Sequence, residues 1–302
     1  MRLRKPRLLS AIRRAWRPRR PVHLVALVTA AVWMIFPALS RPGMQAAGSS
    51  RPQLEESFRL MYELKFNAAR VQISSYKLDS PEDPLGEAAE AASFLFEQFN
   101  EKGVLTSAFF LDDDRLQDGI EGSPDQRLSS AFLEANQKAR TSAERILKTH
   151  ADDLGALLTL CLTDGMQGDF EALVAKHQLA GLRLIRRAER EADRVLRIDP
   201  GAGDAYVAIG AANYIIGTLP AYKRFLLWFG NIRGDKARGL EQLEVASVRG
   251  HYLRPLAKVM LALASERERQ FDRARMLFGD LTREFPGNPV FARELELLKT
   301  RR

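Results

Sequence analysis

The densest set of potential cation ligands is an acidic stretch at residues 112–125. Aligned on a calcium-binding loop, it fills positions 1, 5, 6 and 12 with Asp114, Asp118, Gly119 and Asp125. Leu116 stands at position 3, where a ligand is needed, and position 12 lacks the usual bidentate Glu. We therefore expect a solvated connector rather than a calcium site, with Asp112 or Ser123 as the N-cap of a following helix.

The remaining reactive side chains are isolated. The four histidines lie far apart in sequence: His23, His150, His177 and His251. His150 stands where a helix is expected to end, and neither His177 nor His251 has a Cys, a His or an acid at metal-pair spacing. The single Cys161 lies in an apolar stretch, so we expect a buried small side chain and no internal disulfide. Neither a Gly-x-Ser-x-Gly motif nor a phosphate-binding P-loop occurs. The sequence thus predicts no catalytic residue, no cofactor and no metal, although an acid or nucleophile pair brought together by folding stays an alternative.

From residue 54 onward the apolar residues recur at helical spacing, with little of the alternation typical of strands. Turn-forming residues rich in Pro, Gly, Asn and Asp separate the apolar stripes. The pattern predicts an all-α protein with helices over 54–76, 85–101, 126–149, 153–163, 178–198, 204–216, 236–248, 254–267, 271–284 and 290–299.

A spacing repeat runs through these helices. A small residue is followed by packing residues at offsets 4 and 7, and in three copies by proline at offset 12. In the clearest copy Phe278 and Pro286 follow Ala274. A small residue lets two helices approach closely, and proline ends a helix where the chain must turn. We expect repeat-packing roles for Phe278, for Pro286 and for the small residues that start the five copies: Ala69, Ala139, Ala188, Gly239 and Ala274.

The copy around Leu261 to Pro286 resembles a tetratricopeptide repeat (TPR), a helix-turn-helix unit. This resemblance implies an α-solenoid of degenerate TPRs over 54–302, with an irregular helical bundle as the alternative. Residues 205–298 also resemble the C-terminal half of TPR-like proteins that include a mitochondrial outer-membrane and inclusion-body-clearance family, through the Tyr214–Pro220 turn and Phe285–Asn288. That second resemblance implies an adaptor without catalytic residues.

Residues 214–229 form the most apolar stretch of this region, with Lys223 and Arg224 as its only charges. We favour a core helix here, because most apolar helical stripes are buried. The alternative is an exposed wall that docks a partner helix, a lipid or a small molecule. Its contact residues would be Tyr214, Leu219, Tyr222, Lys223, Arg224, Phe225, Trp228 and Phe229.

The N-terminal segment has the composition of a targeting signal. Residues 1–21 form a basic leader, and residues 22–40 form an apolar run without formal charge. Together they predict an export signal or a single transmembrane anchor, followed by a flexible tether over 41–53. Cleavage near Ala38–Ser40 and a mitochondrial presequence stay open as alternatives.

Charge along the chain sets the expected location and partners. The basic leader keeps the N-terminus in the cytoplasm by the positive-inside rule, so we expect an inner-membrane protein with residues 54–302 on the periplasmic side. If the signal is cleaved, the same domain is soluble in the periplasm. Residues 55–302 carry 35 basic and 38 acidic side chains, a balance that does not indicate nucleic-acid binding. The sequence predicts a non-catalytic scaffold or adaptor in the cell envelope that binds a protein or peptide.

Overall fold

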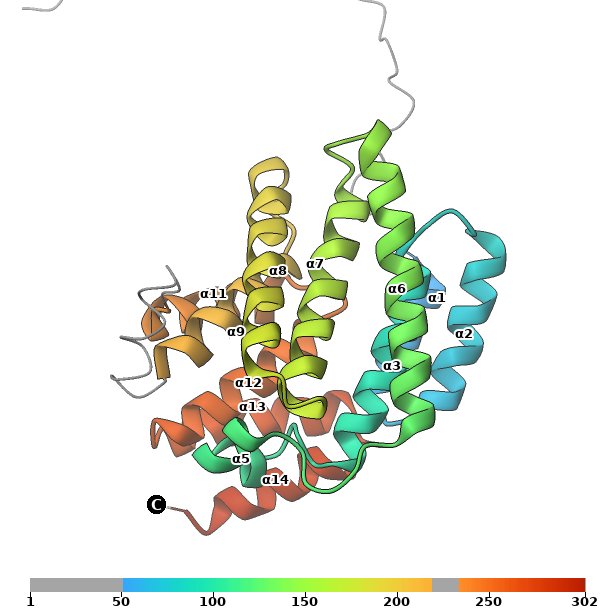
Figure 1. Cartoon of the computed structure of the whole chain (residues 1–302). Helices are drawn as coiled ribbons and strands as arrows, with labels where there is room; N and C mark the ends of the chain where they lie inside the picture. Colours follow the sequence, from blue (N-terminus) through green and yellow to red (C-terminus); the bar gives the residue numbers. More distant parts are fainter. Residues whose placement is uncertain (1–50, 219–233, 302) are drawn as a thin grey trace, which may run out of the picture. The chain divides into compact units, whose positions relative to one another are not determined.

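The computed structural model describes residues 51–218 and 234–301, all within the compact unit Met44–Arg302. These residues form helices joined by turns and contain no strand, which confirms the all-α prediction for this part of the chain. Figure 1 shows the helices, which are α1 (Pro52–Tyr62), α2 (Phe66–Asp79), α3 (Leu85–Glu101), α4 (Ser107–Phe110), α5 (Asp113–Asp118), α6 (Gln126–Thr149), α7 (Leu154–Asp169), the π-helix η1 (Phe170–Val174), α8 (Gln178–Ile198), α9 (Ala205–Thr218), α11 (Lys236–Arg249), α12 (Arg254–Arg267), α13 (Phe271–Glu284) and α14 (Pro289–Lys299).

The helices pack as successive pairs. The pairs are α1 with α2, α3 with α6, α7 with α8, α9 with α11, and α12 with α13. Each second helix also packs on the first helix of the next pair, the last of these contacts being α13 with α14. The first helices contact one another in the order α1, α3, α7, α9 and α12. Most of the packing is therefore between elements that are near neighbours in chain order.

The five small residues of the spacing repeat each lie on the second helix of a pair. All five are buried: Ala69, Ala139, Ala188, Gly239 and Ala274. Phe278 is also fully buried, whereas Pro286 lies exposed in the turn after α13. At Gly239 the helices cross closely, since an added Cβ would lie 2.5 Å from the backbone nitrogen of Tyr214 on α9. A larger side chain at this crossing would push the two helices apart.

The single helix expected over 54–76 is wrong, because the chain forms two helices there. Helix α1 ends at Tyr62, and Leu64 adopts a left-handed conformation with φ of 61°. The backbone N–H of Lys65 then donates to the carbonyl of Leu60 over 2.9 Å, the hydrogen bond of a Schellman turn. The sequence gives no signal of this break because glycine usually occupies the left-handed position. The expected tether is also shorter, since α1 begins at Pro52, where proline suits the first turn of a helix.

The two ends of the helical unit meet. The hydroxyl of Tyr62 donates to the carbonyl of Tyr252 at 3.1 Å, and the side-chain amide of Asn288 donates to the carbonyl of Tyr62 at 2.7 Å. The rings of Phe58 and Tyr252 lie 5.0 Å apart. In a linear repeat stack each unit contacts only its neighbours. Here the first helix instead contacts segments that follow it by 190 and 226 residues.

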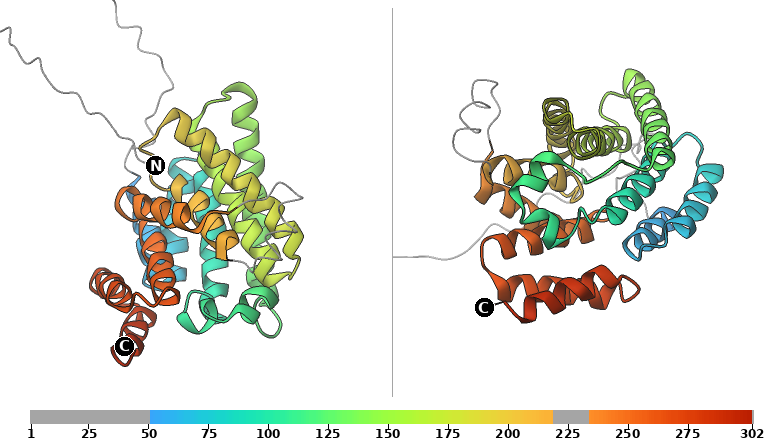
Figure 2. Two further views of the ribbon diagram at one scale, coloured as in Figure 1. Left: turned by 90° about the vertical axis from the view of Figure 1, so that its left-hand side faces the viewer. Right: turned by 60° about the horizontal axis from the view of Figure 1, so that its bottom comes forward.

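The region between α3 and α6 is not a purely solvated connector. Phe109, Phe110 and Ile120 are buried, and the short helix α4 packs on α12. Asp112 is the N-cap of α5, which confirms one of the two expected caps. The N-cap of α6 is Asp125 rather than Ser123. In the right-hand view of Figure 2, the green helix α5 lies in front of the paired helices, with its acidic residues exposed.

Within residues 51–218 and 234–301, every helix is too short or too polar to cross a bilayer. The predicted basic leader, the apolar run at 22–40 and nearly all of the tether lie outside the described residues.

Candidate functional site

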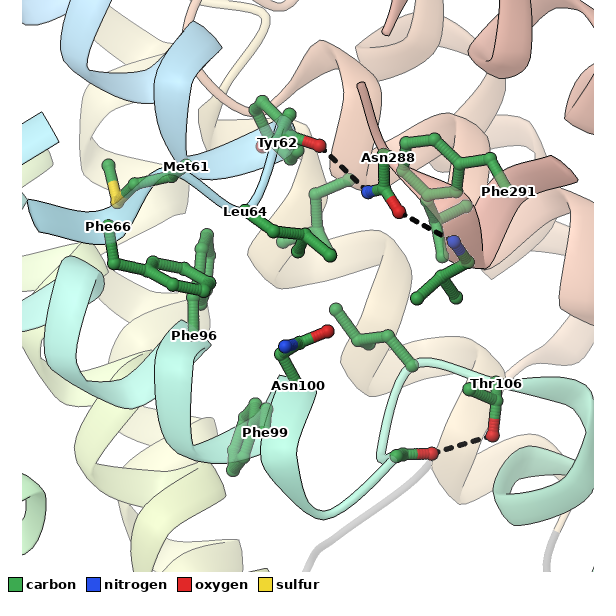
Figure 3. Close-up of a pocket in the computed structure, with 15 residues that line it drawn as sticks. Met61, Tyr62, Leu64, Phe66, Phe96, Phe99, Asn100, Thr106, Asn288 and Phe291 are labelled. Atoms are coloured by element: carbon green, nitrogen blue, oxygen red, sulfur yellow. Dashed lines mark hydrogen bonds between the residues drawn. The ribbon is translucent and has the colours of Figure 1, made fainter. Parts of the chain in front are cut away.

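An apolar pocket opens between helices from the two ends of the unit (Figure 3). Its walls come from the turn between α1 and α2, the end of α3 with the segment that follows it, α12, and the start of α14. The lining residues are Met61, Tyr62, Leu64, Phe66, Phe96, Phe99, Asn100, Gly103, Leu105, Thr106, Leu256, Val259, Asn288, Val290 and Phe291.

Two local backbone features place side chains around this pocket. The left-handed Leu64 reverses the chain between α1 and α2, so that residues on both sides of the turn line the pocket. Asn288 begins α14 as its N-cap, accepting from the backbone N–H of Val290 at 2.9 Å. Because its amide also donates to the carbonyl of Tyr62, Asn288 fixes α14 against α1 at the edge of the pocket.

The polar atoms of the lining are mostly engaged within the protein. Both ends of the Asn288 amide are hydrogen-bonded, and the hydroxyl of Thr106 donates to the carbonyl of Gly103 at 2.6 Å. Asn100 is the exception: its exposed side chain rises from the end of α3 towards Leu64. The surface offered to a ligand is therefore apolar, with one free amide at the rim.

The size of the pocket limits what it can hold. Its volume is about 70 Å³, roughly half the ~150 Å³ of an engineered apolar cavity that binds benzene. That space suits a group of the size of a leucine side chain. Leu64, Phe96 and Leu105 are only partly buried around it, so they can extend the apolar contact outward. Chemically the site can accept an apolar side chain, with the Asn100 amide available to a backbone group beside it.

Buried carboxylates lie next to this region on α12 and α14. Glu266 is 3% exposed and Glu294 is 2% exposed. The backbone N–H of Ser107 donates to Glu294 at 3.3 Å, and Arg301 pairs with Glu266. Burial raises the pKa of Glu266, Arg301 opposes that rise, and the nearby Glu294 adds to it. These contacts attach α4 and the C-terminal end of the chain to α12 and α14.

A third buried acid, Asp164, joins three helices elsewhere. Asp164 on α7 is 1% exposed and accepts two hydrogen bonds from Arg187 of α8, at 2.6 and 2.7 Å. Arg140 of α6 pairs with the same carboxylate. One buried charge with two cations and a bidentate contact is a structural clamp, because each charge-assisted bond offsets the desolvation of the acid.

The histidines have ordinary partners. His177 contacts Glu171 at 2.9 Å, and His251 contacts Glu55 at 3.1 Å. Both histidines are exposed, and Cys161 is buried as expected. Among the described residues, no three His, Cys, Asp or Glu side chains gather closely enough to hold a metal ion.

Of the residues predicted for the apolar wall, only Tyr214 is described. Its side chain is 1% exposed and its ring stacks on Phe110, with centroids 6.3 Å apart and an interplanar angle of 9°. The idea that Tyr214 stands on an exposed wall is therefore corrected, because α4 covers it. Burial raises the pKa of Tyr214 to about 12. The other predicted contacts lie outside the described residues: Leu219, Tyr222, Lys223, Arg224, Phe225, Trp228 and Phe229.

The pocket was not predicted from the sequence. Its residues are ordinary members of apolar stripes, and no short-range pattern connects residues 61–106 with residues 256–291. Its one distinctive signal is the Pro286–Pro289 turn, in which Asn288 could have been identified as a helix cap but not as a partner of α1. Comparison of the chain with protein-family models and with curated proteins finds no match.

Proposed function

We propose that this chain is a non-catalytic adaptor built from degenerate TPRs, which binds a segment of a partner protein. The repeat assignment is supported by the pairwise packing of the helices and by the buried small residues, one on the second helix of each pair. Helix pairs stacked in this way present their first helices as a continuous binding surface. The joined ends make it a closed variant of such a stack.

The observation that carries the binding proposal is the pocket among the first helices. Its walls belong to α1, α3, α12 and α14, its polar atoms are mostly satisfied internally, and its rim is partly buried apolar surface. A helical partner that inserts one apolar side chain gains about 1.5–3 kcal/mol from its burial. Asn100 can then hydrogen-bond the partner and fix its register.

Site-specific crosslinking tests this proposal. A photoreactive amino acid replaces the exposed Asn100 in the full chain, and the same residue replaces Lys148 on the second helix α6 as a control. In intact cells that make the protein, we expect a discrete adduct from position 100 and none from position 148. Leu105→Asp should abolish the adduct, because a carboxylate at the apolar rim loses its hydration when the partner docks.

A matched substitution separates binding from folding. Leu133 on α6 is 40% exposed, and Leu133→Asp makes the same chemical change away from the pocket. Leu133→Asp should leave both the melting temperature and the adduct unchanged. Equal crosslinking with Leu105→Asp and with the native chain would contradict the pocket as the binding site.

We further propose that the adaptor acts in the cell envelope. This proposal rests on the basic leader and apolar run at residues 1–40, which are typical of a signal anchor or a cleaved export signal. A reporter that is active only outside the cytoplasm, fused after Arg302, should be active. Activity of a cytoplasmic reporter alone at that position would contradict this location.

A further inference from the structure

The segment Ser107–Asp118, which comprises α4 and α5, has too few residues to be helical on its own. Its helices have 4 and 6 residues, whereas isolated helices shorter than about 12–15 residues are marginal in water. The segment therefore keeps its conformation through contacts with the first helices. Figure 2 shows that it lies beside α12 and in front of the pairs rather than within one of them.

Phe109 of this segment is buried in the core, and the backbone N–H of Ser107 donates to Glu294 of α14. Two residues of the first helices make its remaining specific contacts. Tyr214 of α9 stacks on the ring of Phe110. Arg267 of α12 donates to the carbonyl of Phe110 at 2.9 Å and pairs with the carboxylate of Asp113. The ring of Tyr214 and the guanidinium of Arg267 thus contact an aromatic residue, Phe110, and an acid three positions later, Asp113. Both attractions are specific in geometry, ring against ring and cation against carboxylate.

One polar group of Tyr214 is left without a hydrogen bond where Ser107–Asp118 packs on it. The hydroxyl of Tyr214 is buried and has no hydrogen-bond partner among the described residues. A buried hydroxyl without a partner is destabilising, because it has lost its hydrogen bonds to water. No described group of Ser107–Asp118 hydrogen-bonds this hydroxyl.

The segment is also bracketed by backbone positions suited to a hinge. In the described residues the three glycines with positive φ are Gly103, Gly119 and Gly122, one before the segment and two after it. Their φ values lie between 64° and 75°, a region that glycine occupies freely. Hinges are commonly a few such residues that absorb the backbone change when a segment moves.

We propose that Tyr214 and Arg267 form a binding site for an aromatic–acidic peptide of a partner protein, and that Ser107–Asp118 occupies this site in cis. The proposal rests on the adaptor function above and adds the chemistry of the partner: an aromatic residue followed by a carboxylate. Because Leu105 and Thr106 line the apolar pocket, the cis segment begins at the edge of that pocket. A partner that displaces it gains a continuous surface from the pocket to Arg267.

If Ser107–Asp118 occupies the site, a free peptide must compete with it for Tyr214 and Arg267, and this competition can be measured. A tethered segment has an effective concentration on the order of millimolar, so a free peptide competes poorly with it. The probe is a fluorescent synthetic peptide with the sequence of residues 107–118, added to the purified full chain. The release variant Phe110→Ala/Asp113→Asn removes the cis anchors and leaves Tyr214 and Arg267 intact. We expect it to bind the peptide at least 10-fold more tightly than the native chain does.

A receptor variant tests the assigned site. Adding Arg267→Gln to the release variant should weaken peptide binding at least 5-fold. Adding Arg283→Gln should not, because Arg283 lies exposed on α13 and pairs with its neighbour Asp280. A peptide with Asp113 replaced by Asn should also bind more weakly. Equal affinity of the native chain and the release variant, or no effect of Arg267→Gln, would overturn the proposal.

Hydrogen exchange on the native chain keeps the test decisive if the release variant does not fold. The amides of residues 107–118 should exchange at least 10-fold faster than those of α3 and α12, because the segment opens as a unit. Exchange as slow as in α3 and α12 would show a permanent part of the core and overturn the proposal. Crosslinking at Asn100 does not depend on Arg267, so failure here is distinguishable from failure of the adaptor function.

Discussion

Asp169 is a carboxylate at the end of α7, where the chain passes into the π-helix η1. None of the described residues provides it with an ion pair, and burial raises the pKa of Asp169 to about 7. An acid whose folded-state pKa lies above its unfolded value destabilises the protein as pH rises between the two values. The penalty is absent below about pH 4 and complete above about pH 7.

Asp169→Asn should therefore stabilise the protein at pH 8 and have little effect at pH 4. The asparagine cannot ionise, so the variant escapes a penalty of about 2–4 kcal/mol at the higher pH. Urea unfolding of the full chain at both pH values measures the difference. Asp152→Asn, in the exposed turn before α7, serves as the control and should behave alike at both values. A gain for Asp169→Asn that is the same at pH 4 and pH 8 would contradict this account.

At the scale of single residues, the sequence predicted those whose role is local. The capping role of Asp112 could be predicted because its side chain bonds backbone N–H groups two and three residues away. The burial of Cys161 could be predicted because its neighbours in the sequence are apolar. Leu64 was not predicted, because a left-handed leucine is stabilised by its turn and its packing rather than by its own preference. Tyr214 looked like a possible surface contact because the segment that covers it comes from about a hundred residues earlier in the chain.

Two glycines on second helices, Gly239 and Gly279, differ in how closely a neighbouring helix approaches them. On α11, a Cβ at Gly239 would lie 2.5 Å from the backbone nitrogen of Tyr214, and Gly210 of α9 lies at the same crossing. On α13, a Cβ at Gly279 would meet no atom within 4 Å. Backbone cannot move aside as a flexible side chain can, so the first glycine is required and the second is not.

The same substitution should thus have opposite effects at the two positions. Gly239→Ala should destabilise by about 1–3 kcal/mol through overpacking of α9 against α11. Gly279→Ala should stabilise by about 0.5–1 kcal/mol, because alanine is the better helix former and nothing obstructs it. Thermal melts of the two variants test this. A stabilising Gly239→Ala would show that α9 and α11 are not as close as the structure has them.

Among elements, the predictable helices are those specified by local signals. The ranges expected for α6, α8, α12 and α13 agree with the structure because amphipathic spacing and flanking turns are local to each helix. Of the four, only α6 also has a side-chain N-cap. Helices α4 and α5 were not predicted, since their apolar residues pack against distant helices rather than along a stripe. The candidate pocket was missed for the same reason: its walls meet only after folding.

For the whole molecule, the contact between its ends changes how it should unfold. A linear repeat array can open from either end, since each unit depends only on its neighbours. In this chain the first helix is bonded to the turns before α12 and α14, so opening one end removes support from the other. This closure could not be predicted from the sequence, because it depends on single polar side chains, Tyr62 and Asn288, that are far apart in the chain.

Asn288→Ala should loosen both ends at once. The substitution removes the N-cap of α14, worth about 1 kcal/mol, and leaves the buried carbonyl of Tyr62 without its donor, for a total of about 2–3 kcal/mol. Hydrogen exchange should accelerate in α1 as well as in α14, although the two helices lie at opposite ends of the described chain.

Asp235→Ala is the matched control, because Asp235 caps α11 through the backbone N–H of Arg238 and is exposed. Its loss should cost only the cap, about 1 kcal/mol, and should leave exchange in α1 unchanged. The excess cost of Asn288→Ala over Asp235→Ala then measures the bond between the ends. If Asn288→Ala accelerates exchange in α14 alone, the ends are not coupled and the unit opens as an ordinary linear stack does. If α1 and α14 respond together, the contact between Asn288 and Tyr62 that joins the ends also fixes the walls of the pocket between these helices.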